Sequence, residues 1–498
     1  MRKVFSFIVD HAEYIFIAIL IGIALFLGLS QGGFAESNLT PDNPNHYANK
    51  IFDQSYVHKV EVEIDEEKYN ELLSAPTDKS KYLANVIIDG ERINDIAFST
   101  RGNASLFTLA EDESTDRYSY KINFQKFHDA QRYHGLDKLI LNNLYADSSY
   151  LRDYLAFEIM RESGVSAPLT SFTELYINGE LRGLYLAIED VDKSFLARNA
   201  FPSESVLYKP EATALDKYAL KKIYESIPEG EELQIVLSAD DPEFNCEGSD
   251  LVYIGDDIIS YPAVFNNAVS KVSSADKEYF IKSIKSLSPV SLDDPTEYWD
   301  IDALVQYFAT NNFLVGWDSY TGSTAHNYYL LVAPGKNTLL PWDYNLALMS
   351  TRFIDDFWVD EDWPIDELMV RKESDTRPVW KLIIDNPDNY EKYHEALQRL
   401  LDSYILNGKY RETINRITDL IRPYVYSDPT RFHSVEEFET DINNIRSFIL
   451  LRADSVQKQL WGIERSTFEP EPEPEPEDEL EEPSYEEYTE SELYELWY

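Results

Sequence analysis

The pattern of apolar residues changes along this 498-residue chain, and the change restricts the folds that it can adopt. Up to about residue 190, short alternating apolar runs are separated by Asp89-Gly90 and Asn178-Gly179, which are typical turns of β-hairpins. One amphipathic helix is expected among these strands, over residues 151–163. From Ile301 onward the apolar residues follow helical spacing. The sequence therefore predicts an α+β protein with a mostly antiparallel sheet before a mostly helical part.

The individual elements can be given as residue ranges. We expect strands over 57–64, 83–88, 93–98, 118–124, 138–141, 172–177 and 184–188. We expect helices over 65–73, 151–163, 216–226, 275–286, 301–312, 379–385, 389–406, 409–424 and 435–462. The composition supports a globular protein, because 44% of the residues are hydrophobic and 14% are aromatic.

Composition also suggests how the chain is divided into segments. The expected division is 1–35 signal peptide or membrane anchor, 36–54 linker, 55–210 β-rich part, 211–300 insertion or linker, 301–465 helical part and 466–498 tail. The tail is an acidic stretch rich in Pro and Glu that cannot bury enough apolar area to fold alone, so we expect it to be disordered. The single cysteine, Cys246, cannot form an intramolecular disulfide.

The N-terminus has the features of an export signal. Arg2 and Lys3 precede an apolar run over residues 14–29, and small residues follow at Gly33 and Ala35. This pattern predicts either a signal peptide cleaved after Ala35 or an uncleaved membrane tether. Because the two basic residues stay on the cytoplasmic side, both alternatives place the rest of the chain outside the cytoplasmic membrane.

The formal net charge of −46 limits the partners of the chain. An acidic field repels nucleic-acid phosphates and anionic lipid, so neither is an expected partner. A basic polypeptide rich in Ser and Thr would suit this charge better. An acidic and aromatic strip over residues 355–367 fits such a substrate, although a solvated loop is the alternative interpretation. Part of the charge can equally reflect a salty habitat.

Three polar residues after residue 310 have the chemistry of a phosphoryl-transfer site. Asp318 precedes Asn327 by nine positions, and Asp343 directly follows an apolar strand. In such sites one carboxylate orients the attacking hydroxyl, while an amide and a second carboxylate hold magnesium on the nucleotide phosphates. Turn capping by the two aspartates is the simpler interpretation, because the pattern alone is common in a chain with 90 acidic residues.

The surrounding motifs resemble those of the spore coat protein H (CotH) kinases, a family of secreted atypical protein kinases. The resemblance extends in family order over residues 55–350. It is carried by residues 100–105 (TRGNAS), 119–124 (SYKINF), 147–156 (DSSYLRDYLA), 175–180 (LYINGE), 183–192 (GLYLAIEDVD), 207–210 (LYKP), 311–320 (NNFLVGWDSY), 326–330 (HNYYL) and 340–345 (LPWDYN).

This resemblance implies an atypical two-lobe kinase fold, with a β-rich N-lobe containing one main helix and a mostly helical C-lobe. It also implies an ATP-dependent protein Ser/Thr kinase that uses Mg²⁺ or Mn²⁺. Asp318 would be the catalytic base, and Asn327 and Asp343 would bind the metal. The chain departs from the family at Asn123, where a basic residue is common, and at Asn345, where an acidic residue is common.

Five residues are candidates for nucleotide binding. Lys121 lies on a predicted strand, where its ammonium group would neutralise phosphate oxygens, and Glu158 on the helix would pair with it. Arg101 offers a bidentate guanidinium group beside a glycine. Glu189 lies in the segment expected to contact the adenine, and Lys209 follows a short strand. The competing interpretations are an exposed strand lysine and a solvated helical glutamate.

Two other function classes remain open at this point. The first is a catalytically weak, kinase-shaped binding or scaffold protein of the envelope, which Asn123 and the acidic tail favour. The second is a polysaccharide-acting enzyme, because tyrosines, tryptophans and carboxylates also line sugar clefts. This second alternative leaves Lys121, Asn327 and the ordered motifs unexplained.

Overall fold

The computed structural model describes residues 43, 46–211, 248–349, 351–352, 358–370 and 376–463. Several expectations fall outside these residues. They concern the N-terminal segment 1–35 with its apolar run, the helix over 216–226, Cys246, and the tail over 466–498. Within the described part of the chain, no helix is long and apolar enough to cross a membrane.

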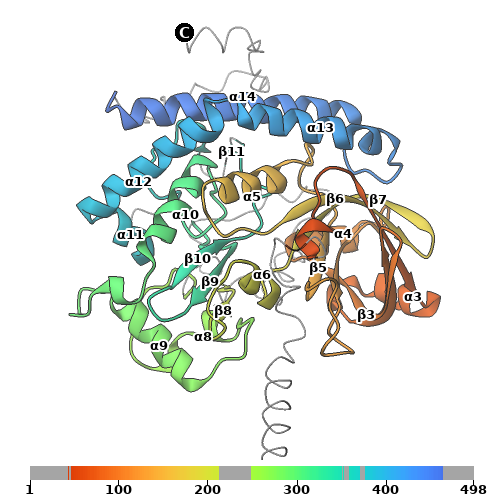
Figure 1. The fold of residues 1–498 in the computed structure, drawn as a ribbon, viewed down its shortest axis with the longest axis horizontal. Helices are drawn as coiled ribbons and strands as arrows, with labels where there is room; N and C mark the ends of the chain where they lie inside the picture. Colours follow the sequence, from red (N-terminus) through yellow and green to blue (C-terminus); the bar gives the residue numbers. More distant parts are fainter. Residues whose placement is uncertain are drawn as a thin grey trace, which may run out of the picture.

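Seven strands of the first half form a closed barrel in the order β1-β2-β3-β4-β5-β7-β6. The barrel lies on the right in Figure 1, where β3, β5, β6 and β7 are labelled. Neighbouring strands are antiparallel except β1 and β6, whose parallel pairing closes the barrel. The strands are β1 His58–Ile64, β2 Tyr82–Ile88, β3 Glu91–Arg101, β4 Ser119–Asn123, β5 Lys138–Asn142, β6 Thr170–Ile177 and β7 Glu180–Glu189.

Alternating side chains explain why these segments form a barrel. In β1, buried residues alternate with more exposed ones, as expected for a strand with one face toward a core. The buried rings of Phe98, Tyr120 and Tyr185 come from three different strands, and neighbouring ring centroids lie 4.7 and 6.3 Å apart. The barrel therefore encloses an aromatic core of its own, which is separate from the core of the helical part.

The linker expected over residues 36–54 is not a linker in its second part. Tyr47 lies in the short 3₁₀ helix η2 Tyr47–Asn49 and is only 1% exposed, and Ile51 is also buried. The Tyr47 hydroxyl donates a hydrogen bond to Glu189 Oε1 over 2.5 Å. The segment 46–54 is therefore anchored to the barrel by Tyr47, Ile51 and Phe52, whose side chains belong to the barrel core.

A small sheet covered by helices lies outside the barrel. Its strands, in the order β10-β9-β8, are β8 Val206–Tyr208, β9 Tyr328–Val332 and β10 Thr338–Pro341. Because β8 pairs with β9, it belongs to this sheet and not to the β-rich part expected over 55–210. A two-stranded ladder, β11 Thr351–Arg352 with β12 Trp358–Val359, follows.

Helices pack around this sheet and against one another. They are α6 Lys193–Arg198, α8 Pro262–Phe265, α9 Ser274–Lys285, α10 Ile301–Phe313, α11 Pro378–Ile384, α12 Pro387–Leu400, α13 Lys409–Ser427 and α14 Val435–Leu460. The helix expected over 389–406 continues from α12 into a π-helical turn, η9 Leu401–Ile405. Around the barrel lie η3 Pro76–Asp78, α3 Glu66–Ser74 and α4 Ala104–Glu111, and the loops of the second half contain η6 Ile258–Ser260 and η7 Pro295–Glu297.

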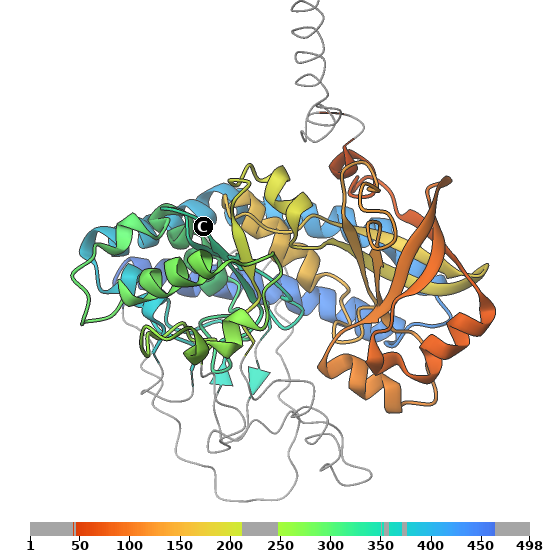
Figure 2. The same cartoon turned by 90° about the horizontal axis from the view of Figure 1, so that it is seen from below.

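Helix α5 Arg152–Glu162 connects the two parts of the molecule. It contacts β6 of the barrel and α10 of the helical part, and most of its residues are buried. In Figure 1, α13 and α14 extend along one edge past α5 toward the barrel, and Figure 2 shows the barrel and the helical part side by side. In this arrangement the start of α5 lies next to α14, because Arg152 pairs with Asp441.

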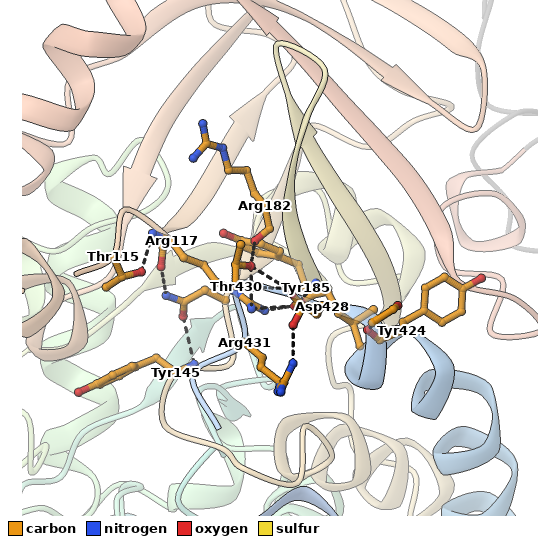
Figure 3. A network of polar contacts seen from close by, with 12 residues as sticks. Thr115, Arg117, Tyr145, Arg182, Tyr185, Tyr424, Asp428, Thr430 and Arg431 are labelled. Atoms are coloured by element: carbon orange, nitrogen blue, oxygen red, sulfur yellow. Dashed lines mark hydrogen bonds and ion pairs between the residues drawn. The ribbon is translucent and has the colours of Figure 1, made fainter. Parts of the chain in front are cut away.

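A buried ion pair joins the barrel to the loop between α13 and α14 (Figure 3). Arg117 Nη1 lies 2.8 Å from Asp428 Oδ2, and both side chains are buried. Asp428 Oδ2 also accepts a hydrogen bond from the Leu184 backbone amide over 3.0 Å. Gly183 has φ +110° here, and a Cβ atom at this position would lie 2.5 Å from Asp428 Oδ2. The junction therefore requires a glycine at residue 183.

Candidate functional site

Asp318 lies in the loop that follows α10, and two side chains of the same loop orient its carboxylate. Asn327 Nδ2 donates to Asp318 Oδ2 over 2.8 Å, and Thr324 Oγ1 donates to Asp318 Oδ1 over 3.2 Å. The structure therefore brings Asp318 and Asn327 into contact although nine positions separate them. Burial and the nearby negative charge of Asp343 raise the pKa of Asp318 to about 7.

The shape of this loop depends on close backbone contacts. At Gly322, an added Cβ atom would lie 1.6 Å from the carbonyl oxygen of Trp317, so no other residue fits there without a rearrangement. The buried Arg377 side chain holds the same turn, because it donates to the carbonyl oxygens of Tyr320 and Gly322. These contacts fix the path of the chain between Asp318 and Asn327.

Asp343 follows β10 and adopts a left-handed backbone conformation with φ +57°. The backbone amide of the next residue, Tyr344, donates to Asp153 Oδ1 over 2.6 Å. Burial, and then the charge of Asp343, raise the pKa of Asp153 well above its usual value. Asp343 and Asp318 line one pocket, whose other lining residues are Gly316, Ser319, Trp342, Tyr344, Leu346 and Ala347.

A group of basic side chains lies on one face of the barrel. Lys121 Nζ on β4 is 2.6 Å from Asp190 Oδ2, and Lys138 Nζ on β5 is 3.1 Å from Asp192 and 3.5 Å from Asp190. Burial lowers the pKa of Lys121. Burial alone would raise the pKa of Asp190, but the two lysines lower it to about 2. Asp190 is therefore the shared counter-ion of both lysines.

Arg101 connects this basic face to the acidic pocket. It is the last residue of β3, and its guanidinium group lies 4.9 Å from the ring centroid of Trp342, the residue before Asp343. Arg101 also contributes to the electrostatics of Lys121, Asp190 and Asp153. The barrel thus presents a cation at the pocket, as a site for an anionic ligand requires.

The expected pairing of Glu158 with Lys121 is wrong. Glu158 lies on the part of α5 that packs near α13, where Thr413 Oγ1 donates to its carboxylate over 3.3 Å and Arg161 lies 3.7 Å away. Asp190, which directly follows β7, pairs with Lys121 instead. Asp190 takes the place expected of Glu158 because of the strand register: β7 runs beside β5 and brings residue 190 to the lysines.

Glu189 does not present its carboxylate for a nucleotide. The side chain is fully buried and accepts hydrogen bonds from Arg198, from Tyr47 and from the Leu169 backbone amide. These contacts tie η2 and α6 to the barrel, so Glu189 has a structural role that the sequence pattern did not indicate. Its backbone amide is also engaged, in a hydrogen bond to the Leu169 carbonyl oxygen.

Lys209 lies near the loop that carries Asn327. It forms an ion pair with Glu211, and Glu211 Oε2 lies 3.2 Å from Nδ1 of His326. Glu211 also contributes to the electrostatics of Asp318. The structure therefore brings Lys209 close to the acidic pocket, but with a carboxylate already bound to its ammonium group.

Four side chains of this region were missed by sequence reasoning: Asp153, Lys138, Thr324 and Asp190 as the partner of Lys121. Lys138 had a detectable signal. It begins a predicted strand, and in the structure it stands directly opposite Asn123. A basic residue thus occupies the neighbouring strand at the position where β4 carries an amide. The role of Asp153 depends on the packing of α5, which no local pattern reports.

The donor chemistry of the pocket fits a hard divalent cation. Among the described residues, no group of three or more His, Cys, Asp or Glu side chains is arranged to hold a metal. Asp318, Asn327 and Asp343 are two carboxylates and one amide, which suffice for Mg²⁺ because it retains several waters. The Asn327 nitrogen is used by Asp318, so its oxygen is the atom suited to a cation. A cation would also relieve the repulsion that raises the pKa of Asp318.

These observations define a class: an α+β protein whose acidic pocket, built after α10 and β10, is linked by Arg101 to the basic face of a closed, mostly antiparallel barrel. The chain belongs to the CotH kinase protein family, whose model matches residues 98–456. This match confirms the resemblance seen in the sequence motifs. It also extends beyond them, because it includes the long helices up to residue 456.

Two curated proteins of Bacillus subtilis (strain 168) are similar to this chain. The inner spore coat protein H is 22% identical over 350 residues, which cover 69% of this chain and 83% of that protein. The inner spore coat protein H-like protein is 32% identical over 93 residues, which cover 19% of this chain and 29% of that protein.

Proposed function

We propose that this chain is an ATP-dependent protein kinase that transfers the γ-phosphoryl group to Ser or Thr hydroxyls of an extracytoplasmic protein of the envelope or spore-coat type. The single observation that carries the proposal is the arrangement around one pocket: Asp318 and Asp343 line it, Asn327 is hydrogen-bonded to Asp318, and Arg101 of the barrel lies over the ring of Trp342. Membership of the CotH kinase family and the similarity to an inner spore coat protein support it.

In this proposal the residues of the pocket have distinct roles. Asp318 orients the substrate hydroxyl and receives its proton, while Thr324 and Asn327 keep the carboxylate in place. Asn327 and Asp343 hold Mg²⁺ or Mn²⁺, which when bound supplies charge neutralisation at the phosphates. The loose transfer state makes positioning and electrostatics more important than early proton removal.

The basic face of the barrel would hold the nucleotide phosphates. Lys121 and Arg101 are the first candidates, and Lys138 adds a third cation from the neighbouring strand. Asp190 takes the part expected of Glu158, because it holds Lys121 in place by an ion pair. The barrel would then correspond to the N-lobe of a kinase and the helical part to the C-lobe.

The substrate class follows from charge. With 90 acidic and 44 basic residues, the chain attracts basic polypeptides at long range, so we propose basic Ser/Thr-rich segments as substrates. Within the segment expected to contact them, Asp366 accepts hydrogen bonds from Tyr390 and His394, so this carboxylate has a structural role. The location we propose is extracytoplasmic, secreted or tethered through residues 14–29.

One observation favours a second candidate, a kinase-shaped binding or scaffold protein. Lys121 and Lys138 are already neutralised by Asp190 and Asp192, and Lys209 by Glu211. A nucleotide must compete with these carboxylates for the lysines. If these carboxylates keep the phosphates away from the lysines, the protein binds no ATP and acts through its surface.

Calorimetric titration with a non-hydrolysable ATP analogue and Mg²⁺ separates the two candidates. The kinase proposal predicts binding that Lys121→Met weakens at least tenfold and that Lys126→Met leaves unchanged. Lys126 is an exposed lysine just beyond β4, so it is a matched control. If the wild-type protein binds no nucleotide, the kinase proposal fails and the binding-protein candidate takes its place.

A further inference from the structure

Asp153 is a buried aspartate close to the pocket that the proposed chemistry leaves without a role. It is the second residue of α5 and is only 2% exposed. The preceding residue, Arg152, is fixed by two carboxylates, Asp147 at 2.7 Å and Asp441 of α14 at 2.6 Å. The start of α5 is therefore held to α14, which gives Asp153 a well-defined position.

The Asp153 carboxylate makes one direct contact with the segment that carries Asp343. Its Oδ1 atom accepts the hydrogen bond from the Tyr344 backbone amide over 2.6 Å, and its Oδ2 atom accepts one from Asn142 Nδ2 over 3.3 Å. Asn142 belongs to β5 of the barrel. Asp153 thus connects the barrel, α5 and the chain after β10 through a single carboxylate.

The backbone at Asp343 is stabilised by such a contact. Its φ of +57° lies in the left-handed region, which is less favourable than φ < 0° for a residue with a Cβ atom, although Asp adopts it more readily than most residues. The amide that follows Asp343 is the group that Asp153 binds. Loss of this hydrogen bond would allow the backbone to relax toward φ < 0°, and the Asp343 side chain would then turn away from its present direction.

We infer that Asp153 is the positioning residue of Asp343: through the Tyr344 amide, it holds the carboxylate of Asp343 in the direction from which it binds the metal of the nucleotide complex. The inference rests on the proposed function. It assigns no contact between Asp153 and the substrate, the metal or the nucleotide. A carboxylate placed here only to begin a helix would have no need to contact the segment of the pocket.

A comparison of Asp153→Ala with Asp153→Asn distinguishes the effect of the hydrogen bond to the Tyr344 amide from the effect of the negative charge. An Asn oxygen can still accept from the Tyr344 amide, whereas Ala cannot. Asp302→Ala is the matched control, because Asp302 is also the second residue of a helix, α10, but is exposed and paired with Lys392. If Asp153→Ala does not fold, Asp153→Ser replaces it, since the shorter hydroxyl does not reach the amide.

The test is the binding of Mn²⁺ by the full chain in the presence of a non-hydrolysable ATP analogue, followed by the electron paramagnetic resonance signal of free Mn²⁺. We expect Asp153→Ala to weaken Mn²⁺ binding at least tenfold, Asp153→Asn to stay within about threefold of wild type, and Asp302→Ala to match wild type. Hydrogen exchange at the peptide containing Tyr344 should become at least tenfold faster in Asp153→Ala alone.

The outcomes distinguish this inference from the proposed function. If the wild type binds Mn²⁺ and nucleotide but Asp153→Ala binds them equally well, the positioning role is wrong and the kinase proposal stands. If Asp153→Asn is as impaired as Asp153→Ala, the hydrogen bond to the Tyr344 amide is not the cause, and the inference is overturned. If the wild type binds neither Mn²⁺ nor the nucleotide analogue, both the proposed function and this inference are wrong.

Discussion

Lys121 and Asp190 form an ion pair, with Nζ 2.6 Å from Oδ2, at the face of the barrel beside the acidic pocket. Asp190 is shared with Lys138, whose ammonium group lies 3.5 Å from the same oxygen. One carboxylate therefore holds two lysines that would otherwise repel each other. This arrangement keeps two cations close together without a bound anion, and it gives a direct way to test the basic face.

Removal of Asp190 should cost stability because it leaves the two lysines without their common partner. We expect Asp190→Asn to lower the free energy of unfolding by about 2 kcal/mol, less than for a fully buried pair because Lys121 is 31% exposed. Urea unfolding of Asp190→Asn, Lys121→Met and the double variant measures the coupling. Strictly additive effects would show that the pair does not interact in solution.

Substitutions of Glu158 and of Asp190 should have different effects on nucleotide binding. Glu158→Gln should leave the affinity for the Mg²⁺–ATP analogue within about twofold of wild type, because Glu158 contacts Thr413 and Arg161 and not Lys121. Asp190→Asn should weaken the affinity severalfold, because Lys121 and Lys138 lose the carboxylate that holds them in place. Calorimetric titration compares them, and a larger effect of Glu158→Gln would contradict the assignment of Asp190.

The junction between the barrel and the α13–α14 loop should tolerate no side chain at Gly183. Gly183→Ala places a Cβ atom 2.5 Å from Asp428 Oδ2 and 2.8 Å from Arg117 Nη1, so the buried ion pair must move. We expect a loss of about 3 kcal/mol or more in the free energy of unfolding, in the range for a broken buried pair.

Gly179→Ala is the control for backbone strain at this hairpin. Gly179 also has a positive φ, +85°, but an added Cβ atom meets nothing within 4 Å. This substitution should cost about 1 kcal/mol, because only the left-handed backbone is penalised. Denaturant unfolding measures both variants, and equal losses would show that the contact with Asp428 is unimportant.

The raised pKa of Asp318 predicts a pH-dependent stability in metal-free buffer. The folded-state pKa is about 7, whereas an unfolded aspartate titrates near 3.9. Between these values the folded protein binds more protons than the unfolded chain, so its stability falls as the pH rises from about 4 to 7. Asp318→Asn removes this effect. The variant should therefore become more stable relative to wild type as the pH rises through that range, and the difference in the free energy of unfolding should be at most about 4 kcal/mol at pH 8.

Unfolding midpoints at pH 5 and pH 8, in the presence of a chelator, measure this gain. The exposed Asp302→Asn substitution serves as the control, because it removes a carboxylate at the surface that is paired with Lys392. Added Mg²⁺ should reduce the difference between wild type and Asp318→Asn, since a cation compensates the charge that burial and Asp343 make costly. Parallel pH profiles for all three proteins would contradict the raised pKa.

Local patterns were sufficient for most of the described elements. The two hairpins with their Asp-Gly and Asn-Gly turns, the helix after Leu151 and the long helices after Ile301 all appear close to the expected ranges. The closure of the barrel could not be predicted, because the parallel pairing of β1 with β6 joins residues more than a hundred positions apart. Tyr47 was missed since an isolated aromatic in a polar stretch carries no periodic signal.

The sequence was sufficient to find the main acidic and amide residues of the candidate site, but not to predict which side chains contact one another. Asp318 and Asp343 stand out because they follow α10 and β10 and line one pocket, and Asn327 stands out because it directly precedes β9 and binds Asp318. The partner of Lys121 depends on strand register and on how α5 packs, so the sequence suggested Glu158 where the fold places Asp190. Asp153 was missed for the same reason, because its contact with Tyr344 joins residues 191 positions apart.

Kinase activity is tested by the transfer of radiolabel from γ-labelled ATP to a basic Ser-rich peptide, with Mg²⁺ or Mn²⁺. We expect transfer by the wild type, a loss of at least a hundredfold in Asp318→Asn and in Asp343→Asn, and unchanged transfer in Asp302→Asn. Transfer that persists in both pocket variants would contradict the assigned roles. Absence of transfer by a wild type that also fails to bind nucleotide would contradict the kinase itself.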